Sequence, residues 1–256
     1  MESRKNPKIW AIGDLHLQGG HVKPMDVFGP NWKDHFLKIS ADWREKVSAE
    51  DIVLIPGDIS WAMQLAEALP DLNAIAQLPG HTVILKGNHD YWWCSLTQLR
   101  SSLPENITVI QNDAWDAGFC VFCGTRGWGI PGSEEEKEQD VKIYRREVGR
   151  LEMSLKEAKR IAEGRPVFAL MHYPPVLPEM LKDGTDFTRL LTDYGVTRCV
   201  YGHLHGQSVR RGIHRFYKGV RYDLVSCDSL DFKLLDVSLD SPEMEENEKY
   251  EADPEA

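Results

Sequence analysis

Short apolar runs alternate with longer amphipathic segments along this chain, and the alternation predicts an α/β fold. Five apolar runs have the length of buried strands, and they end at Ile12, Ile55, Leu85, Met171 and Tyr201. Helices are predicted over residues 32–48, 61–78, 96–103 and 186–194. Strands are also predicted over 108–110 and 119–122. Beyond residue 205, alternating apolar and polar positions predict antiparallel strands over 208–210, 215–217, 222–225 and 233–237.

One further helix is long and regular. Ser133 and Glu136 form a capping-box pattern at its start, and Gly164 with Pro166 supplies a stop. Its apolar positions recur at spacings of three and four: Val141, Tyr144, Val148, Leu151, Leu155, Ala158 and Ala162. The stripe covers too few heptads to favour a coiled-coil seam, so we expect it to pack on the sheet.

Polar side chains follow each of the five apolar runs. In chain order they occur in Gly13-Asp14-Leu15-His16, Gly57-Asp58, Gly87-Asn88-His89-Asp90, His172 and Gly202-His203-Leu204-His205. The carboxyl ends of parallel strands meet at one edge of a sheet, so we expect these side chains to converge. In extended chain, the spacing of Asp14-x-His16 and of His203-x-His205 would place both members of each pair on one side. Carboxylate, imidazole and amide ligands without a thiolate set suit Mn, Fe, Zn or Ni.

Each motif alone has an ordinary structural explanation. A single histidine such as His172 at a strand end is more often a satisfied polar residue than a metal ligand. Five segments that together supply a complete set of ligands in order have no comparable structural explanation. The combination therefore favours a metal site.

These motifs, in this order, resemble those of the calcineurin-like metallophosphoesterase superfamily, and the resemblance spans residues 9–205. Residues 23–26 and 88–93 are also similar to a bacterial branch of predicted phosphohydrolases. The resemblance implies the metallo-dependent phosphatase fold, a four-layer α-β-β-α sandwich of two mixed sheets flanked by helices.

The resemblance also implies roles for the ligands. Asp14, His16 and His205 would bind one metal ion, while Asn88, His172 and His203 would bind the other. Asp58 would bridge the two. The cofactors would be two divalent or trivalent transition-metal ions, with Mn favoured. Two such ions roughly 3.5 to 4 Å apart can activate a hydroxide and stabilise the attacking and leaving oxygens of an in-line displacement.

Residues beside the ligands are candidates for catalysis and substrate binding. We expect His89 to act as general acid or charge stabiliser, with Asp90 accepting a hydrogen bond from its imidazole. Tyr91 and Tyr173 are candidates for substrate binding because they directly follow Asp90 and His172. Arg126 is a third candidate, because an arginine fork can bind a phosphate oxygen. The alternatives are that Arg126 is a surface residue and that the neighbouring aromatics, Trp92 and Trp93, begin a helix and pack beneath the site.

Composition and charge indicate the class of protein and its domain organisation. The 256 residues are 42% hydrophobic and 27% charged, which is ordinary for a globular domain. We expect one catalytic domain over 1–238 and a disordered acidic tail over 239–256, because residues 240–256 hold eight acids against Lys249. The five cysteines are odd in number and scattered along the chain, which fits reduced thiols better than a disulfide framework; this includes the Cys120-x-x-Cys123 pair. The amino terminus lacks a signal-peptide pattern, so a cytoplasmic protein is expected, with no membrane or nucleic-acid partner. The oligomeric state stays open.

The predicted function is hydrolysis of a small phosphomonoester or phosphodiester. A nuclease is less favoured because no basic stripe occurs, and a nucleotide-lipid pyrophosphatase because no amphipathic membrane surface occurs. A non-catalytic binding module would be expected to lack motif residues. Ile59-Ser60-Trp61-Ala62 follows Gly57-Asp58, where the protein Ser/Thr phosphatase branch has Gly-Asp-x-x-Asp-Arg-Gly, so a phosphoprotein substrate is disfavoured.

Overall fold

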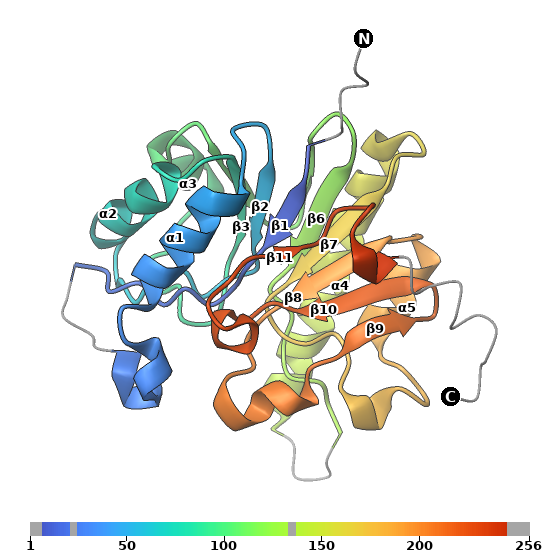
Figure 1. The fold of residues 1–256 in the computed structure, drawn as a ribbon. Helices are drawn as coiled ribbons and strands as arrows, with labels where there is room; N and C mark the ends of the chain where they lie inside the picture. Colours follow the sequence, from blue (N-terminus) through green and yellow to red (C-terminus); the bar gives the residue numbers. More distant parts are fainter. Residues whose placement is uncertain (1–6, 21–24, 133–136, 245–256) are drawn as a thin grey trace.

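The computed structural model describes residues 7–20, 25–132 and 137–244, and these residues form two β-sheets flanked by helices (Figure 1). The first sheet has the order β11-β1-β2-β3-β4, with bounds Leu235–Asp236, Ile9–Ala11, Ile52–Ile55, His81–Leu85 and Ile107–Ile110. The second has the order β5-β6-β7-β8-β10-β9, with bounds Ala114–Asp116, Val121–Thr125, Val167–Met171, Arg198–Tyr201, Val220–Leu224 and His214–Tyr217.

Both sheets are mixed, with parallel strands at their centres. Strands β1 to β4 are parallel to one another, and so are β6, β7, β8 and β10. The antiparallel strands β11, β5 and β9 lie at sheet edges. The central strands are mostly apolar and wholly buried, as expected where both faces of a sheet are covered. Their carboxyl ends therefore converge along one side of the molecule.

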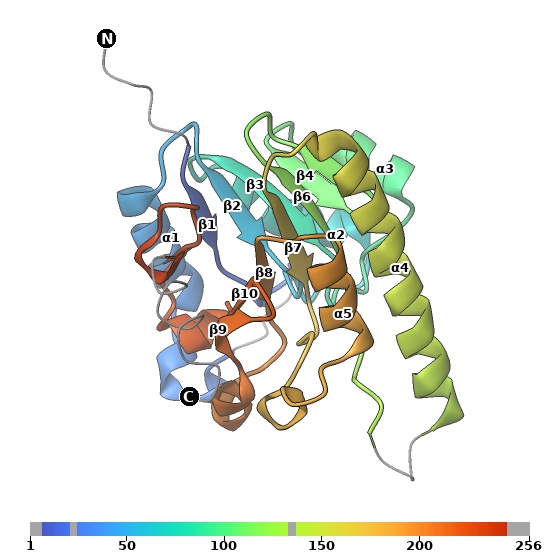
Figure 2. The same ribbon diagram turned by 90° about the vertical axis from the view of Figure 1, so that its right-hand side faces the viewer.

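Helices cover the outer face of each sheet. Helices α1 (His35–Lys46), α2 (Leu65–Ala76) and α3 (Leu96–Ser102) pack on the first sheet. Helices α4 (Glu138–Ala162) and α5 (Asp186–Asp193) pack on the second, and Figure 2 shows α4 running along its outer face beside α5. Between the sheets lies a separate apolar core that includes Leu54, Phe122 and Phe168. The four-layer sandwich predicted from the sequence is therefore confirmed.

The long helix confirms the prediction that its apolar stripe packs on the sheet. Leu151, Leu155 and Ala158 are buried against the second sheet. The predicted capping box, Ser133 with Glu136, lies outside the described residues. Within them the helix begins at Glu138, after the cap residue Lys137.

Several predicted boundaries were wrong. Residues 208–210 form part of a 3-10 helix, η4 (Gly206–Arg211), because an alternation of three residues is too short to distinguish a strand. Helix α1 starts at His35, since Trp32 ends the preceding 3-10 helix η2 (Pro30–Trp32). Trp92 and Trp93 are buried as proposed, but helix α3 starts only after its cap, Ser95. The remaining 3-10 helices are η1 (Met25–Phe28), η3 (Pro178–Met180), η5 (Cys227–Leu230) and η6 (Pro242–Met244).

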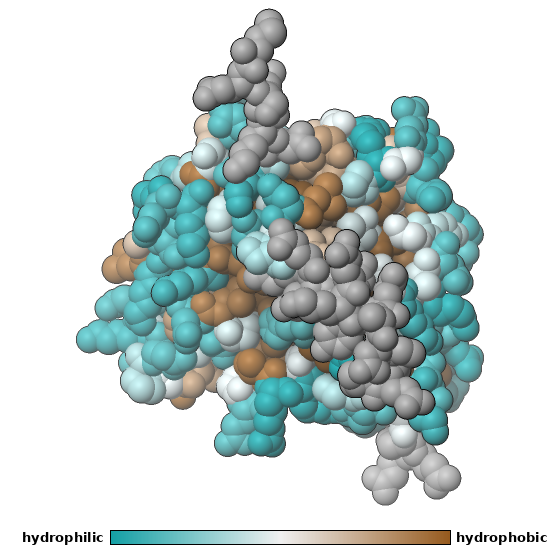
Figure 3. Space-filling view, turned by 45° about the vertical axis from the view of Figure 1, so that its right-hand side comes forward, coloured by the Kyte–Doolittle hydropathy of each residue, from teal (hydrophilic) through white to brown (hydrophobic). Residues whose placement is uncertain are grey.

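Helix hydropathy, the surface and the end of the described chain bear on the remaining sequence predictions. None of the described helices is both long and apolar enough to cross a bilayer. On the face shown in Figure 3, hydrophilic residues predominate and hydrophobic ones appear in separate patches. Ser241, within the segment predicted as a tail, is buried and accepts a hydrogen bond from Arg198. The 3-10 helix η6 also lies in this segment, and residues 245–256 lie outside the described part of the chain. Cys120 and Cys123 are buried free thiols in different cores, as expected.

Candidate metal centre

The five motifs converge at the carboxyl ends of β1, β2, β3, β7 and β8. Four of the seven expected ligands have a left-handed backbone: Asp14 (φ 57°), His16 (φ 46°), Asp58 (φ 52°) and His203 (φ 75°). The expectation of an extended chain across the Asp14-x-His16 and His203-x-His205 pairs was therefore wrong. Such conformations cost roughly 1–3 kcal/mol each and persist where surrounding contacts over-determine them, which is typical of functional sites.

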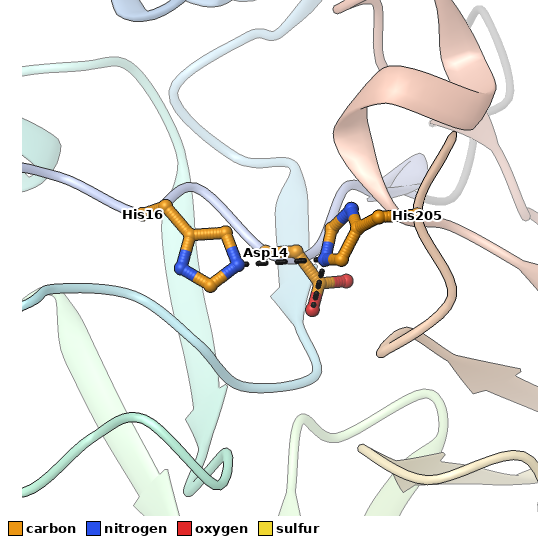
Figure 4. Close-up of side chains that lie close together, drawn as sticks. All are labelled: Asp14, His16 and His205. Atoms are coloured by element: carbon orange, nitrogen blue, oxygen red, sulfur yellow. Dashed lines mark hydrogen bonds and ion pairs between the residues drawn. The ribbon is translucent and has the colours of Figure 1, made fainter. Parts of the chain in front are cut away.

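Asp14, His16 and His205 form the first group of donors (Figure 4). Nε2 of His205 lies 3.4 Å from Nε2 of His16 and 3.4 Å from Oδ1 of Asp14. The main-chain N–H of His203 donates to both Asp14 oxygens at 3.1 Å, which fixes that carboxylate. The side chains of this first group point toward one another.

Asn88, His172 and His203 form the second group. Oδ1 of Asn88 lies 2.6 Å from Nε2 of His172 and 2.9 Å from Nδ1 of His203. The other ring nitrogen of His172, Nδ1, lies 3.0 Å from the carbonyl oxygen of Pro56. That second contact fixes the ring so that Nε2 faces Asn88, as is usual for a histidine ligand.

Asp58 lies between the two groups. Its Oδ2 is 3.8 Å from Nε2 of His16 and 3.5 Å from Nε2 of His172, while its Oδ1 accepts a hydrogen bond from the N–H of His89 at 2.8 Å. Burial, and then the charge of Asp14, raise the pKa of Asp58 to about 8. A carboxylate at this position can reach both groups.

The electrostatics of the site favour bound cations. Burial lowers the pKa of His16 and of His203 to about 3, so these imidazoles are neutral, the form that binds metal. Burial alone would lower the pKa of His205, but Asp14 and Asp228 raise it to about 10. The carboxylates that attract a proton to His205 would also attract a metal ion. The donor set, nitrogen and oxygen without thiolate, therefore fits transition-metal ions.

Asp228 is a functional residue that the sequence analysis missed. Its Oδ1 lies 2.8 Å from Nδ1 of His205, and its Oδ2 accepts the N–H of Gly206 at 2.9 Å. A carboxylate behind a ligating histidine fixes the tautomer and raises the basicity of the ring. Its position shortly after strand β10, at the same edge as the ligands, was the available signal.

Asp90 anchors the loops of the site. Its Oδ1 accepts from the N–H groups of Ile59 and Ser60 and from the Trp92 indole, and its Oδ2 accepts from the N–H groups of Asp58 and Gly87. Burial raises its pKa to about 6. These five donors tie two loops of the site to one carboxylate, so Asp90 positions the backbone around Asp58 and Gly87. A hydrogen bond from the His89 imidazole to Asp90 stays a prediction.

Aromatic rings form the walls around the donor groups. The Trp61 ring stacks on His16 at 4.8 Å and lies 4.6 Å from the His89 ring, measured between centroids. The Tyr173 ring lies 4.0 Å from the ring of His203, whereas Tyr91 is 57% exposed and 6.3 Å from His89. Tyr173 is therefore placed at the second donor group, and Tyr91 at the outer side of His89.

Arg126 lies in the loop that follows β6. Its Cζ is 4.8 Å from the Trp128 ring centroid, and its main-chain carbonyl accepts the N–H groups of His172 and Tyr173. The backbone of Arg126 thus contacts the segment that carries His172, a proposed metal ligand.

The calcineurin-like phosphoesterase family model matches residues 7–207, and this stretch contains all seven proposed ligands. The chain belongs to the calcineurin-like phosphoesterase family. Members of this family are metal-dependent phosphoesterases, and the groups of Asp14, His16 and His205 and of Asp14, Asp58 and His172 could each hold a metal ion. The family and these donor groups together support a metal-dependent phosphoesterase in general terms.

One curated protein and two solved structures illustrate what this chain is similar to. The Gene 66 protein of Mycobacterium phage D29 is 39% identical over 85 residues, which cover 32% of this chain and 40% of that protein. A phosphopantetheinyl hydrolase from Mycobacterium tuberculosis superposes with a TM-score of 0.53 at 17% identity, covering 93% of this chain and 97% of its own. A protein of unknown function from Aquifex aeolicus gives a TM-score of 0.47 at 14% identity, covering 90% and 95%. At this identity, the likeness to the hydrolase concerns the fold.

Proposed function

We propose that this family member is a two-metal phosphoesterase that hydrolyses a small phosphomonoester or phosphodiester. The observation that carries the proposal is the position of Asp58, whose Oδ2 lies within 3.8 Å of a histidine nitrogen from each donor group. One bridging carboxylate between two sets of donors is the arrangement that holds a pair of cations. Two bound cations would supply Lewis-acid polarisation of the phosphoryl group and would activate a water.

His89 is the side chain that we propose assists the leaving group. It follows Asn88 directly, its N–H is held by Asp58, and its ring lies 5.8 Å from that of His16. In this role the imidazolium would donate its proton to the departing ester oxygen or stabilise charge on the phosphoryl group. Trp61, which packs against both rings, would hold His89 in place and exclude bulk water.

A small substrate is supported by what surrounds the site. The sequence carries a net charge of -10 and no basic stripe that would follow a nucleic-acid backbone. The Gly-Asp motif lacks the arginine pattern of the protein Ser/Thr phosphatase branch, so a phosphoprotein is not proposed. The nitrogen and oxygen donors suit Mn, Fe, Zn or Ni, and reconstitution selects among these ions.

The test is metal reconstitution followed by paired assays. The protein is stripped with a chelator, restored with Mn, Fe, Zn or Ni singly, and assayed on a chromogenic phosphomonoester beside the matching diester. We expect turnover only with metal, lost in Asp58→Asn together with metal binding. In His89→Ala, turnover should fall by about 10²–10⁴-fold while metal content is retained.

The matched control is His81→Ala, because His81 begins β3 at the end opposite the site. That variant should keep both metal and turnover. Absence of turnover on both esters from protein with two metals bound would contradict the proposal. Turnover that survives Asp58→Asn would contradict it equally.

A further inference from the structure

A cationic cavity of about 270 Å³ lies at the carboxyl ends of β3, β4 and β6 and against α4. Its charged lining residues are Lys86, Arg126, Arg146, Arg150 and Glu147. Four cations thus face one carboxylate, in a protein whose overall charge is -10. We call these five residues with their cavity the cationic pocket.

Glu147 holds the arginines in place from the floor of the cationic pocket. It is buried, and its Oε1 lies 2.7 Å from Nη1 of Arg150, 3.7 Å from Nε of Arg146 and 3.8 Å from Nη2 of Arg126. Its Oε2 accepts a hydrogen bond from Thr125. One carboxylate therefore organises three guanidinium groups, although a single close ion pair with Arg150 would satisfy its charge.

The surplus of positive charge points to an anionic ligand. Like charges crowded around a cavity repel one another, so their grouping is unfavourable unless an anion enters. The side chains of Arg146 and Arg150 are 53% and 38% exposed, so both can be reached from solvent. Guanidinium groups bind phosphate oxygens bidentately, which a carboxamide cannot do.

The cationic pocket and the second donor group share their backbone. Lys86 stands two residues before Asn88, at the end of β3. The main-chain carbonyl of Arg126 accepts hydrogen bonds from the N–H groups of His172, at 3.1 Å, and Tyr173, at 2.9 Å. A short substrate with one end at the metal centre could therefore place its other end in the pocket.

We propose that the cationic pocket binds a second phosphate group of the substrate, so that the preferred substrates are small molecules with two separated phosphates. This inference rests on the proposed function, because it takes the hydrolysed phosphate to lie at the metal centre. Arg126 and Arg146 are the specificity-determining residues, and Glu147 positions them. Hydrolysis itself is unchanged: water adds to phosphorus, and the alcohol leaves with a proton.

The test uses bisphosphates of straight-chain α,ω-alkanediols with two to six carbons, each beside the monophosphate of the same diol. Phosphate release by the metal-loaded enzyme gives kcat/KM for every compound. The variants are Arg126→Gln and Arg146→Gln, and the matched control is Arg145→Gln, an exposed arginine on the same helix outside the pocket.

We expect at least one bisphosphate to be preferred over its monophosphate by about tenfold or more, a difference typical of one charged contact. Both variants should lose that preference, so that their kcat/KM for the bisphosphate falls to the value for the monophosphate, and Arg145→Gln should behave as wild type. Equal kcat/KM for bisphosphate and monophosphate at every chain length would overturn the inference, as would a preference that both variants retain.

A second readout separates this inference from the proposed function. Binding of inorganic pyrophosphate to the metal-free protein is measured by calorimetry in the wild type and the same three variants. Weaker binding in Arg126→Gln and Arg146→Gln alone would support the cationic pocket even if no ester were hydrolysed. Identical binding in all four proteins would overturn it even if the metal-dependent hydrolysis were present.

Discussion

The Nδ1 atom of His205 lies 2.8 Å from Oδ1 of Asp228, and this contact turns Nε2 of the same ring toward Asp14 and His16. Replacing Asp228 by Asn should leave the fold intact but lower metal affinity by about 10–100-fold, because the ring loses its orienting carboxylate and some of its basicity. Metal titration of the stripped protein measures the effect.

The matched control for that prediction is Asp231→Asn, because Asp231 is an exposed carboxylate three residues further along the chain. It should bind metal as the wild type does. Equal affinity in the wild type and Asp228→Asn would mean that His205 is not oriented by this contact.

Gly87 allows the loop after β3 to pass against Asp58. A Cβ atom at Gly87 would lie 2.0 Å from Oδ1 of Asp58, and both segments are held by Asp90. Gly87→Ala should therefore displace Asp58, lower metal affinity, and reduce the free energy of unfolding by about 1–3 kcal/mol. Chemical denaturation and metal titration report the two effects.

Gly149 provides the comparison, since it lies in α4 and a Cβ there would meet no atom within 4 Å. Gly149→Ala should raise the free energy of unfolding by roughly 0.5–1 kcal/mol through helix propensity. A Gly87→Ala protein as stable and as metal-competent as the wild type would show that the close approach is not required.

A buried ion cluster around Asp223, away from the site, should make the free energy of unfolding depend on pH in acid. Nε of Arg198 donates to Asp223 at 2.8 Å, and Nη2 of Arg221 donates to it at 3.0 Å. Burial alone would raise the pKa of Asp223, but His214, Arg198 and Arg221 lower it to about 2, against an ordinary value of 3.8. The charged form therefore stabilises the fold above pH about 4, and that contribution of about 2–3 kcal/mol is lost as the pH falls toward 2.

Denaturant unfolding between pH 6 and 2 measures that contribution. Asp223→Asn should be less stable than the wild type by about 3–5 kcal/mol near neutral pH, because it removes the carboxylate that both arginines contact. The difference should narrow as the pH falls below 4. The exposed residue Asp193 serves as control, and Asp193→Asn should follow the wild type at every pH. A difference that stays constant with pH would rule out this titration.

Much of the site could be predicted from the sequence because its ligands follow buried strands directly. The apolar runs ending near Ile55, Leu85 and Met171 indicated parallel strands, and topology brings their carboxyl ends together. The partners of Asp90 could not be predicted, since they depend on how the N–H groups of two loops point in space. Asp228 was missed for a related reason: a single carboxylate without a spaced partner becomes a candidate only when the fold places it behind His205.

The backbone conformation of the two ligand pairs also could not be predicted from the sequence pattern. Asp14 and His16 converge through left-handed conformations, which non-glycine residues seldom adopt and which tertiary contacts impose. The three-residue alternation at 208–210 carried too little information to separate a strand from the 3-10 helix that forms there.

Anomalous diffraction from crystals of Mn-reconstituted protein tests most directly whether Asp58 bridges two metal ions, as we propose. We expect two anomalous peaks roughly 3.5 to 4 Å apart, with Asp58 in contact with both. One should contact Asp14, His16 and His205, and the other Asn88, His172 and His203. A single peak in a fully reconstituted crystal, or a pair of peaks that Asp58 does not touch, would contradict a two-metal site bridged by Asp58.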